Sequence, residues 1–244
     1  MKTSSILRAA AIAAGLTLAS TAFAAPVTGL TTLGDVTQAS TLGSINLGGP
    51  AYLLGTASTA FEDDAPLPAG ALNLSGTAAA DIADLSVALG VAGSAFNDED
   101  NGLFAYEGSA LFTTLNVQAG DTLSLSWRLL GRPDNGPLPT FDAAWLLVGQ
   151  NAIRLGDTAT ATVDQDGWLD TGLQQLSYSF SQAGLVRIGL VVADIGSFDG
   201  TSVLTVQNLA VTAAVPEPGS TVLALSALGV LAGLRARRRS VAPC

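Results

Sequence analysis

The 244-residue sequence contains no histidine, a single cysteine and few charged side chains. Without histidine, the chain has neither a Ser-His nor a Cys-His nucleophile pair and no imidazole ligand for a metal. Its one cysteine, Cys244, cannot form an intramolecular disulfide or a thiolate zinc site. Ten cations face twenty carboxylates, a formal net charge of −10, which disfavours nucleic acid as a partner because its phosphates would be repelled. These absences exclude several classes of enzyme and nucleic-acid-binding protein.

The N-terminal segment has the features of a secretory signal peptide. Lys2 and Arg8 provide a positive start, residues 9–20 are apolar and rich in alanine, and Ala22-Phe23-Ala24 is a small-x-small cleavage site. The apolar stretch is shorter than the roughly 20 residues of an ordinary membrane span. The sequence therefore predicts a signal helix over residues 1–24 with cleavage after Ala24, and the alternative is an uncleaved anchor helix.

The C-terminal segment combines a rigid break, an apolar stretch and a basic end. Pro216, Glu217 and Pro218 precede the apolar residues 221–234. The two prolines fix φ and lack backbone donors, so we expect no regular structure to continue through them. A helix over the apolar residues would reach only about 21 Å, a marginal span without its flanks. Four arginines follow and are expected to stay on the cytoplasmic side as a stop-transfer signal: Arg235, Arg237, Arg238 and Arg239.

This arrangement over residues 215–239 resembles the PEP-CTERM sorting signal of Gram-negative bacteria. The resemblance implies export by the Sec machinery and recognition by an exosortase, a membrane protease or transpeptidase that processes the chain near Pro216-Glu217-Pro218. The arginines and the apolar helix would hold the chain in the inner membrane until then. The alternative is an ordinary C-terminal membrane anchor that follows a proline linker.

Removal of both ends makes the remaining chain strongly acidic. Residues 25–215 keep four arginines and no lysine against nineteen carboxylates, a net charge near −15. Such a surface stays soluble by self-repulsion and attracts divalent cations, but it does not bind anionic lipid or nucleic acid electrostatically. Cys244 lies beyond the predicted processing point, so the processed protein would fold without any disulfide.

The pattern of residues 25–214, here called the body, predicts a mainly β fold. Apolar and polar residues alternate over 123–129, 176–180 and 186–192, the period-2 pattern of half-buried strands. We expect further strands over four segments: 42–47, 51–60, 141–148 and 201–212. Turn residues separate the segments: Gly120-Asp121, Asp134 to Pro137, Asp166-Gly167, Ala183-Gly184 and Asp199-Gly200. Short strands with turns at this spacing indicate a single antiparallel β-sandwich domain.

One segment of the body has helical rather than strand periodicity. Residues 77–89 are rich in alanine, with Ile82, Leu85 and Leu89 at helical spacing and Gly90 as a stop signal. The sequence therefore predicts one short helix within the sandwich.

Four segments of the body, Glu107-Gly-Ser-Ala-Leu, 119–127, 172–180 and 201–211, resemble exported sandwich bodies that precede PEP-CTERM tails. Those bodies in turn resemble jelly-roll carbohydrate-binding modules. The resemblance covers roughly residues 105–213 and implies a jelly-roll-like sandwich. Such bodies tend to have an aspartate before an asparagine near the last strand, whereas Gln207 precedes Asn208 here. No calcium ligand is carried over to this place.

Two acidic loops contain the oxygen ligands that suit calcium. The first includes Asp98 and Asp100, and the second includes Asp164 and Asp166. The first is not an EF-hand loop, because Gly108 occupies the position that requires a bidentate glutamate. The alternative is that both loops are solvated acidic turns. Calcium is the one cofactor for which the sequence offers candidate ligands.

The three tryptophans give one candidate for sugar contact. Trp127 and Trp145 lie among apolar residues and are expected in the core. Trp168 follows Gly167 in an acidic turn, where an exposed indole could stack on a sugar ring. The alternative is that Trp168 covers one end of the sandwich.

Taken together, the sequence predicts an exported, non-enzymatic protein of the cell surface or extracellular matrix. Its tail is the substrate of an exosortase, and family resemblance suggests association with exopolysaccharide or biofilm. One alternative is a periplasmic sugar- or calcium-binding domain that stays anchored in the inner membrane. Another is a glycoside hydrolase, which would need two carboxylates at a set separation, one of them with a raised pKa.

Overall fold

The computed structural model describes residues 23–61, 64–132, 142–161 and 163–214, and Phe23–Ala214 form one compact unit. Residues 1–22 of the predicted signal helix, the Pro-Glu-Pro motif, the apolar segment, the four C-terminal arginines and the turn at 134–137 lie outside these residues. Ala24, the last residue of the predicted signal helix, lies in a short strand. Within the described segments, no helix has both the length and the apolar character needed to cross a bilayer.

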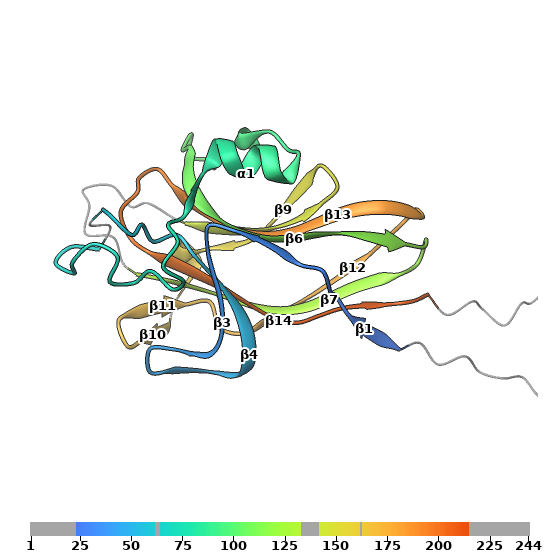
Figure 1. Cartoon of the computed structure of the whole chain (residues 1–244), viewed down its shortest axis with the longest axis horizontal. Coiled ribbons are helices and arrows are strands. Elements are labelled where there is room, and N and C mark those ends of the chain that lie inside the picture. Colours follow the sequence, from blue (N-terminus) through green and yellow to red (C-terminus); the bar gives the residue numbers. More distant parts are fainter. Residues whose placement is uncertain (1–22, 62–63, 133–141, 162, 215–244) are drawn as a thin grey trace, which may run out of the picture. The chain divides into compact units, whose positions relative to one another are not determined.

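Two antiparallel sheets pack face to face, with β6 and β13 above β7 and β14 in Figure 1. The eight-stranded sheet has the order β10-β11-β7-β14-β4-β3, with β1 paired to β14 and β12 paired to β7. Its strands are β1 (Ala24–Pro26), β3 (Asp35–Leu42), β4 (Ile45–Gly55), β7 (Thr122–Gly131), β10 (Val163–Gln165), β11 (Trp168–Asp170), β12 (Gln174–Ser179) and β14 (Ser202–Thr212). The predicted mainly β sandwich is thereby confirmed.

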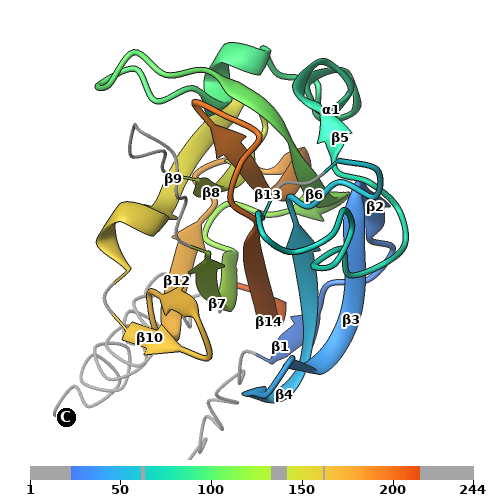
Figure 2. The same cartoon turned by 90° about the vertical axis from the view of Figure 1, so that its left-hand side faces the viewer.

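The six-stranded sheet has the order β2-β6-β13-β8-β9, with the short β5 paired to β6. Its strands are β2 (Thr31–Leu33), β5 (Ala80–Asp81), β6 (Ala105–Val117), β8 (Ala143–Val148), β9 (Asn151–Asp157) and β13 (Gly184–Ile195). Short 3-10 turns lie at Gly93–Phe96 (η1) and Thr158–Thr160 (η2). Figure 2 faces the end of the sandwich at which the segment between β4 and β5 crosses in front of both sheets.

The main core lies between the sheets and follows the predicted alternation. Leu123, Leu125, Trp127 and Leu129 of β7 all point into it, and their polar neighbours point outward. Gly156 of β9 makes room for the indole, since a Cβ there would lie 3.1 Å from a Trp127 ring carbon. The period-2 pattern therefore identified the inward face of β7 correctly.

The helix α1 (Ile82–Leu89) covers the outer face of the six-stranded sheet, above β6 in Figure 1. The Asp81 carboxylate accepts a hydrogen bond from the Ala83 N–H at 2.7 Å, and Gly90 ends the helix with φ of 73°. Leu85 and Leu89 are fully buried against the sheet. The helix is shorter than predicted, because Ala80 and Asp81 pair with β6 as strand β5.

A third apolar cluster lies on the outer face of the eight-stranded sheet. It is built by the β3–β4 hairpin together with residues of β7, β11 and β14. The predicted strand boundaries in this region were wrong, because the turn lies at Gly43-Ser44 and β4 continues through Gly48-Gly49-Pro50. A register shift between Ala39 and Thr41 accommodates the extra residues.

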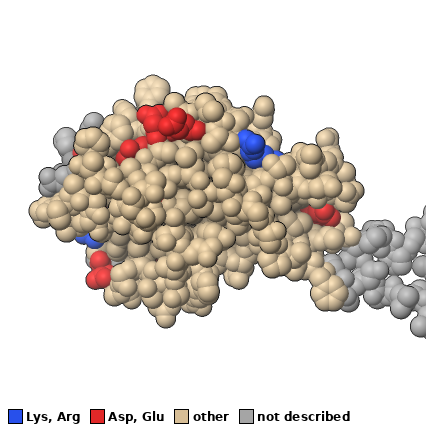
Figure 3. Space-filling model, in the orientation of Figure 1, with Lys and Arg blue, Asp and Glu red and all other residues tan. Residues whose placement is uncertain are grey.

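Charged side chains are sparse on the face shown in Figure 3, where small acidic groups are separated by wide uncharged surface. This distribution agrees with a chain in which only 12% of residues are charged. Recognition on this face must therefore rely on hydrogen bonds and apolar contact as much as on charge.

Candidate functional site

The first predicted calcium loop is closed by its own hydrogen bonds. The Asp98 carboxylate is buried and accepts hydrogen bonds from the side chain and the backbone N–H of Asn101, at 3.0 and 3.2 Å. Arg154 of β9 lies 3.4 Å from the same carboxylate. The Asn101 hydrogen bonds and then the arginine charge hold the pKa of Asp98 below its ordinary value of 3.8. Asp98 therefore already has a cation as partner, whereas Asp100 is exposed.

The second predicted loop attaches to a different part of the sandwich. Asp166 is exposed, with φ of 55°, and accepts a hydrogen bond from the Ser44 hydroxyl at 2.6 Å. The side chain of Asp164 lies outside the described structure. Over the residues that the structure describes, no three His, Cys, Asp or Glu side chains come together to hold a metal. The calcium site stays a prediction from sequence, without a gathered ligand set.

Trp168, the predicted sugar contact, is buried rather than exposed. Its ring belongs to the outer cluster of the eight-stranded sheet, with Leu130 and Val203, and the Arg132 guanidinium lies 5.6 Å from the ring centroid. The expectation of an exposed indole was wrong, because β11 pairs back onto the end of β7 and places the ring beneath the hairpin. Trp127 and Trp145 are buried in the core, as predicted.

A buried carboxylate pair joins the two sheets at the loop end of the sandwich, the end that Figure 2 faces. Asp194 is the residue before the last in β13, and Asp142 immediately precedes β8. The exposed fractions of Asp194 and Asp142 are 1% and 6%. The Asp142 carboxylate accepts hydrogen bonds from the Ser202 hydroxyl and from the Ile195 N–H. Burial, followed by the charge of Asp142, raises the pKa of Asp194 well above 3.8. The buried pair therefore holds a proton to a higher pH than a solvated carboxyl group does.

Polar groups from both sheets surround this pair. The side chain of Thr56, just after β4, hydrogen-bonds Asp194. The Thr56 N–H also donates to the Ser202 carbonyl of β14, and the Ser202 N–H donates to the Thr56 hydroxyl, both at 3.0 Å. Half-buried Glu107 of β6 faces the pair and also raises the pKa of Asp194. A paired carboxylate with a raised pKa is what a glycoside hydrolase needs. Because both groups are almost completely covered, a substrate cannot contact them, and the pair acts as a link between the sheets.

Exposed aromatic side chains gather at the same end. The rings of Tyr106 and Phe198 lie 4.8 Å apart between centroids, tilted by 52°, and are 36% and 50% exposed. Phe104, two residues before Tyr106, is 65% exposed. Sequence reasoning missed this group because it considered only tryptophan. The available signal was a pair of aromatic residues directly after the turn at Gly102, where a strand is only beginning.

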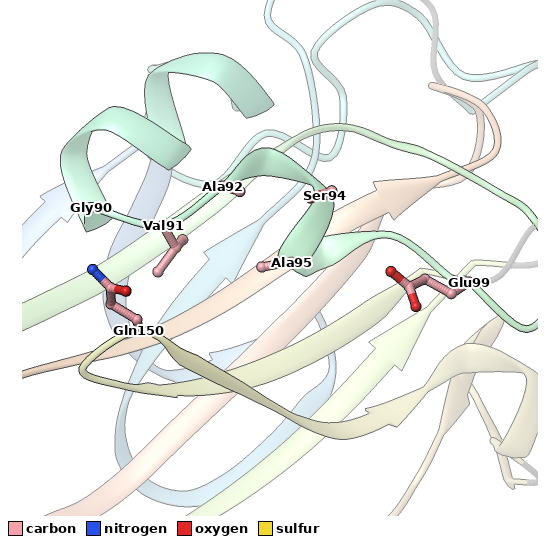
Figure 4. A pocket seen from close by; sticks show the side chains of 7 residues that line it. All are labelled: Gly90, Val91, Ala92, Ser94, Ala95, Glu99 and Gln150. Carbon is pink, nitrogen blue, oxygen red and sulfur yellow. The ribbon is translucent and has the colours of Figure 1, made fainter.

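A shallow hollow of about 380 Å³ lies between the end of α1, η1 and the β8–β9 turn (Figure 4). Its lining is mostly backbone and small side chains, with the Glu99 carboxylate and the Gln150 amide at separate places along it. Arg187 closes the neighbouring helix end by donating to the Ala88 carbonyl at 2.7 Å. The hollow offers neither an aromatic ring nor a pair of groups set for acid–base chemistry.

Comparison with known proteins places a recognisable segment at the end of the chain. Residues 214–239 match the family model of the PEP-CTERM protein-sorting motif. No curated protein matches the chain in sequence. Among solved structures, the chain is similar to TmCBM61 in complex with β-1,4-galactotriose, with 11% identity and a TM-score of 0.33. That alignment covers 76% of this chain and 89% of the other.

The matched motif starts at Ala214, two residues after the last strand ends at Thr212. It contains Pro216, Glu217 and Pro218, the residues that the sequence analysis singled out. The chain therefore carries a PEP-CTERM protein-sorting motif behind a β-sandwich, the mark of an exported protein that an exosortase processes.

Proposed function

We propose that this chain is a non-enzymatic protein of the cell surface or extracellular matrix, delivered there by exosortase and associated with exopolysaccharide. The signal peptide over residues 1–24 directs export through the Sec machinery. The segment 215–239 then holds the chain in the inner membrane, with Arg235 and its basic neighbours as the stop-transfer signal. Processing close to Glu217 frees the body, residues 25–214. The observation that carries the proposal is the sorting motif that directly follows a complete sandwich.

The C-terminal end of the body supports a cut within the motif. The Ala214 N–H donates to the Asp121 carboxylate at 2.9 Å, and Asp121 also accepts from the Gln118 N–H at 2.8 Å. Ala214, the first residue of the matched motif, is thus still hydrogen-bonded to the body. Cleavage near Glu217 leaves every described strand in place, since the last of them ends at Thr212.

The N-terminal end of the body supports signal cleavage in the same way. Strand β1 pairs with β14 in the register Ala24 with Thr212, Ala25 with Val211 and Pro26 with Ala210. Cleavage after Ala24 leaves the rest of this short, exposed edge strand in place. Both expected cuts therefore fall outside the core.

The non-enzymatic role of the body is supported by its chemistry. The chain has no histidine, and its one cysteine lies outside the body. The Asp142–Asp194 pair is buried, so it cannot serve as the accessible pair of acids that a glycoside hydrolase needs. A passive envelope or matrix component needs only a stable fold and a binding surface.

Replacement of Pro216-Glu217-Pro218 by three alanines tests the proposal. We expect the variant to accumulate in the membrane fraction with its tail intact, whereas wild-type protein is processed and leaves that fraction. Mass spectrometry of the C-terminus reports the difference, since an uncut chain retains residues 235–244. The control is Pro68→Ala, which removes an exposed proline of the body.

Wild-type protein that keeps its full C-terminus in cells that make an exosortase would establish the alternative, a permanently anchored periplasmic domain. Equal processing of the triple-alanine variant and wild type would show that the motif is not the recognition element.

A further inference from the structure

Three exposed aromatic residues form one surface at the loop end of the sandwich. Phe104 and Tyr106 enter from the start of β6, and Phe198 enters from the loop between β13 and β14. We refer to these three residues as the aromatic platform. The rings of Phe96, Phe180 and all three tryptophans are buried, whereas Phe23 and Phe61 are exposed like the platform. Within the platform, the rings of Tyr106 and Phe198 come from separate elements and contact each other.

The platform is held by backbone contacts rather than by mobile loops. The Gly196 N–H donates to the Phe104 carbonyl at 2.9 Å, and Ile195 pairs with Ala105 next to it. Ser197 closes the turn before Phe198, because its hydroxyl accepts from the Asp199 N–H at 3.1 Å. Thr201 is tied to the Asp64 carboxylate through its N–H at 2.9 Å and through its hydroxyl. The backbone that carries the rings is thus held in place before any ligand arrives, which lowers the entropic cost of binding.

A polar acceptor borders the rings. Asp199 is exposed one residue after Phe198. A purely apolar partner would strip water from this carboxylate without replacing its hydrogen bonds, at considerable cost. A sugar ring instead presents C–H groups to an aromatic face and hydroxyl donors at its edge. The combination of rings and an exposed carboxylate fits a saccharide better than a lipid chain or an apolar protein surface.

The charges of the body decide which saccharides fit. Its four arginines are all engaged elsewhere: Arg128 with Asp170, Arg132 over Trp168, Arg154 with Asp98 and Asp157, and Arg187 with the helix end. An anionic polymer would therefore meet the exposed Asp199 without an arginine to compensate the repulsion. Neutral saccharides carry no such penalty.

We propose that the aromatic platform binds neutral saccharide chains and so attaches the body to extracellular polysaccharide. This inference rests on the proposed function, which brings the body into contact with such polymers. Tyr106 and Phe198 supply the stacking faces, Phe104 extends the surface, and Asp199 accepts hydrogen bonds from hydroxyl groups.

Affinity electrophoresis of the purified full chain in detergent tests the proposal. The probes are three neutral polymers, a β-glucan, a xylan and a mannan, and one anionic polymer, polygalacturonate. We expect at least one neutral polymer to retard wild-type protein and polygalacturonate to have no effect. The double variant Tyr106→Ala, Phe198→Ala should bind at least about tenfold more weakly. Tyr106→Phe, which keeps the ring, should retain most of the binding.

The matched control is Leu185→Ala, which removes an exposed apolar side chain from the opposite end of β13. Thermal unfolding of each variant shows whether the fold is kept, and Phe104→Ala provides a second, milder test. Unchanged binding in the double variant, retention by polygalacturonate alone, or no retention by any neutral polymer would overturn the proposal. So would a wild-type dimer that the double variant abolishes, because the occupant would then be a second copy. Exosortase is absent from this assay, so a negative result leaves the sorting proposal intact.

Discussion

The substitution Asp194→Asn should change how the stability of this protein depends on pH. The folded state holds the proton of Asp194 to a higher pH than the unfolded chain does, because burial and the neighbouring carboxylates Asp142 and Glu107 raise the pKa of Asp194. The unfolded chain releases that proton near the ordinary value of 3.8. The folded state therefore binds more protons above this pH, and the free energy of unfolding falls as the pH rises.

The size of the effect follows from proton linkage. For one proton, the free energy of unfolding falls by about 1.4 kcal/mol per pH unit between 3.8 and the raised pKa of the folded state. An asparagine at position 194 has nearly the same shape, stays neutral and can still donate to Asp142. The variant should therefore lose this slope and become more stable than wild type toward the upper end of the window.

Urea denaturation at successive pH values, followed by tryptophan fluorescence, measures both free energies. The informative quantity is the difference between variant and wild type, because contributions from other groups cancel in it. A difference that stays constant with pH would refute the reasoning, and so would a wild-type protein that gains stability across the window. A change in the denaturant slope would indicate that the variant has altered the fold instead.

Three further predictions concern stability. Leu85→Ala should lower the free energy of unfolding by about 2–5 kcal/mol, because the Leu85 side chain is fully buried between α1 and the sheet. Val87→Ala, on the exposed face of the same helix, should change it by less than about 0.5 kcal/mol, and thermal unfolding compares the two variants. Asp81→Ala removes the N-cap of this helix and should cost about 1 kcal/mol in urea denaturation, whereas Asp81→Asn should retain most of the stability. Asp98→Asn should remove stability that wild type has above pH 3.8 and loses as the pH falls through the lowered pKa of Asp98; equal acid sensitivity of variant and wild type would contradict this.

Much of the fold could be predicted from alternation of apolar and polar residues. β7, β12 and β13 were located by this pattern, and β14 by its β-branched residues. The alternation did not show that β13 is buried on both faces from Ile188 to Ile195. β9 was missed because none of its residues is fully buried, and β4 was divided because its glycines and proline suggested a break. Turn-forming residues in the sequence cannot show that the partner strand β3 shifts its register to pair with a strand that contains them.

The site was harder to predict than the fold, for a physical reason. The sequence identifies residues that could bind a ligand but not which of them remain exposed. Trp168 is buried because β11 pairs with β7 and places the ring beneath the β3–β4 hairpin, which lies far earlier in the chain. Asp98 is neutralised by Arg154, 56 residues away. The Asp142–Asp194 pair and the Tyr106–Phe198 pair are likewise created by contacts between distant segments. Only the sorting motif, which acts as a linear sequence, could be located from residues alone.

The position of β14 has a mechanical consequence. This strand begins just after the loop that carries Phe198, lies between β7 and β4, and leads directly into the sorting motif. If a polymer held at the aromatic platform pulls against a tail still fixed in the membrane, the force passes along the axis of β14. Its pairs with β7, from Ser202 with Gly131 to Thr212 with Thr122, are then sheared together rather than opened one at a time. Under the two proposals above, tension between the polymer and the tail would therefore load β14 in shear.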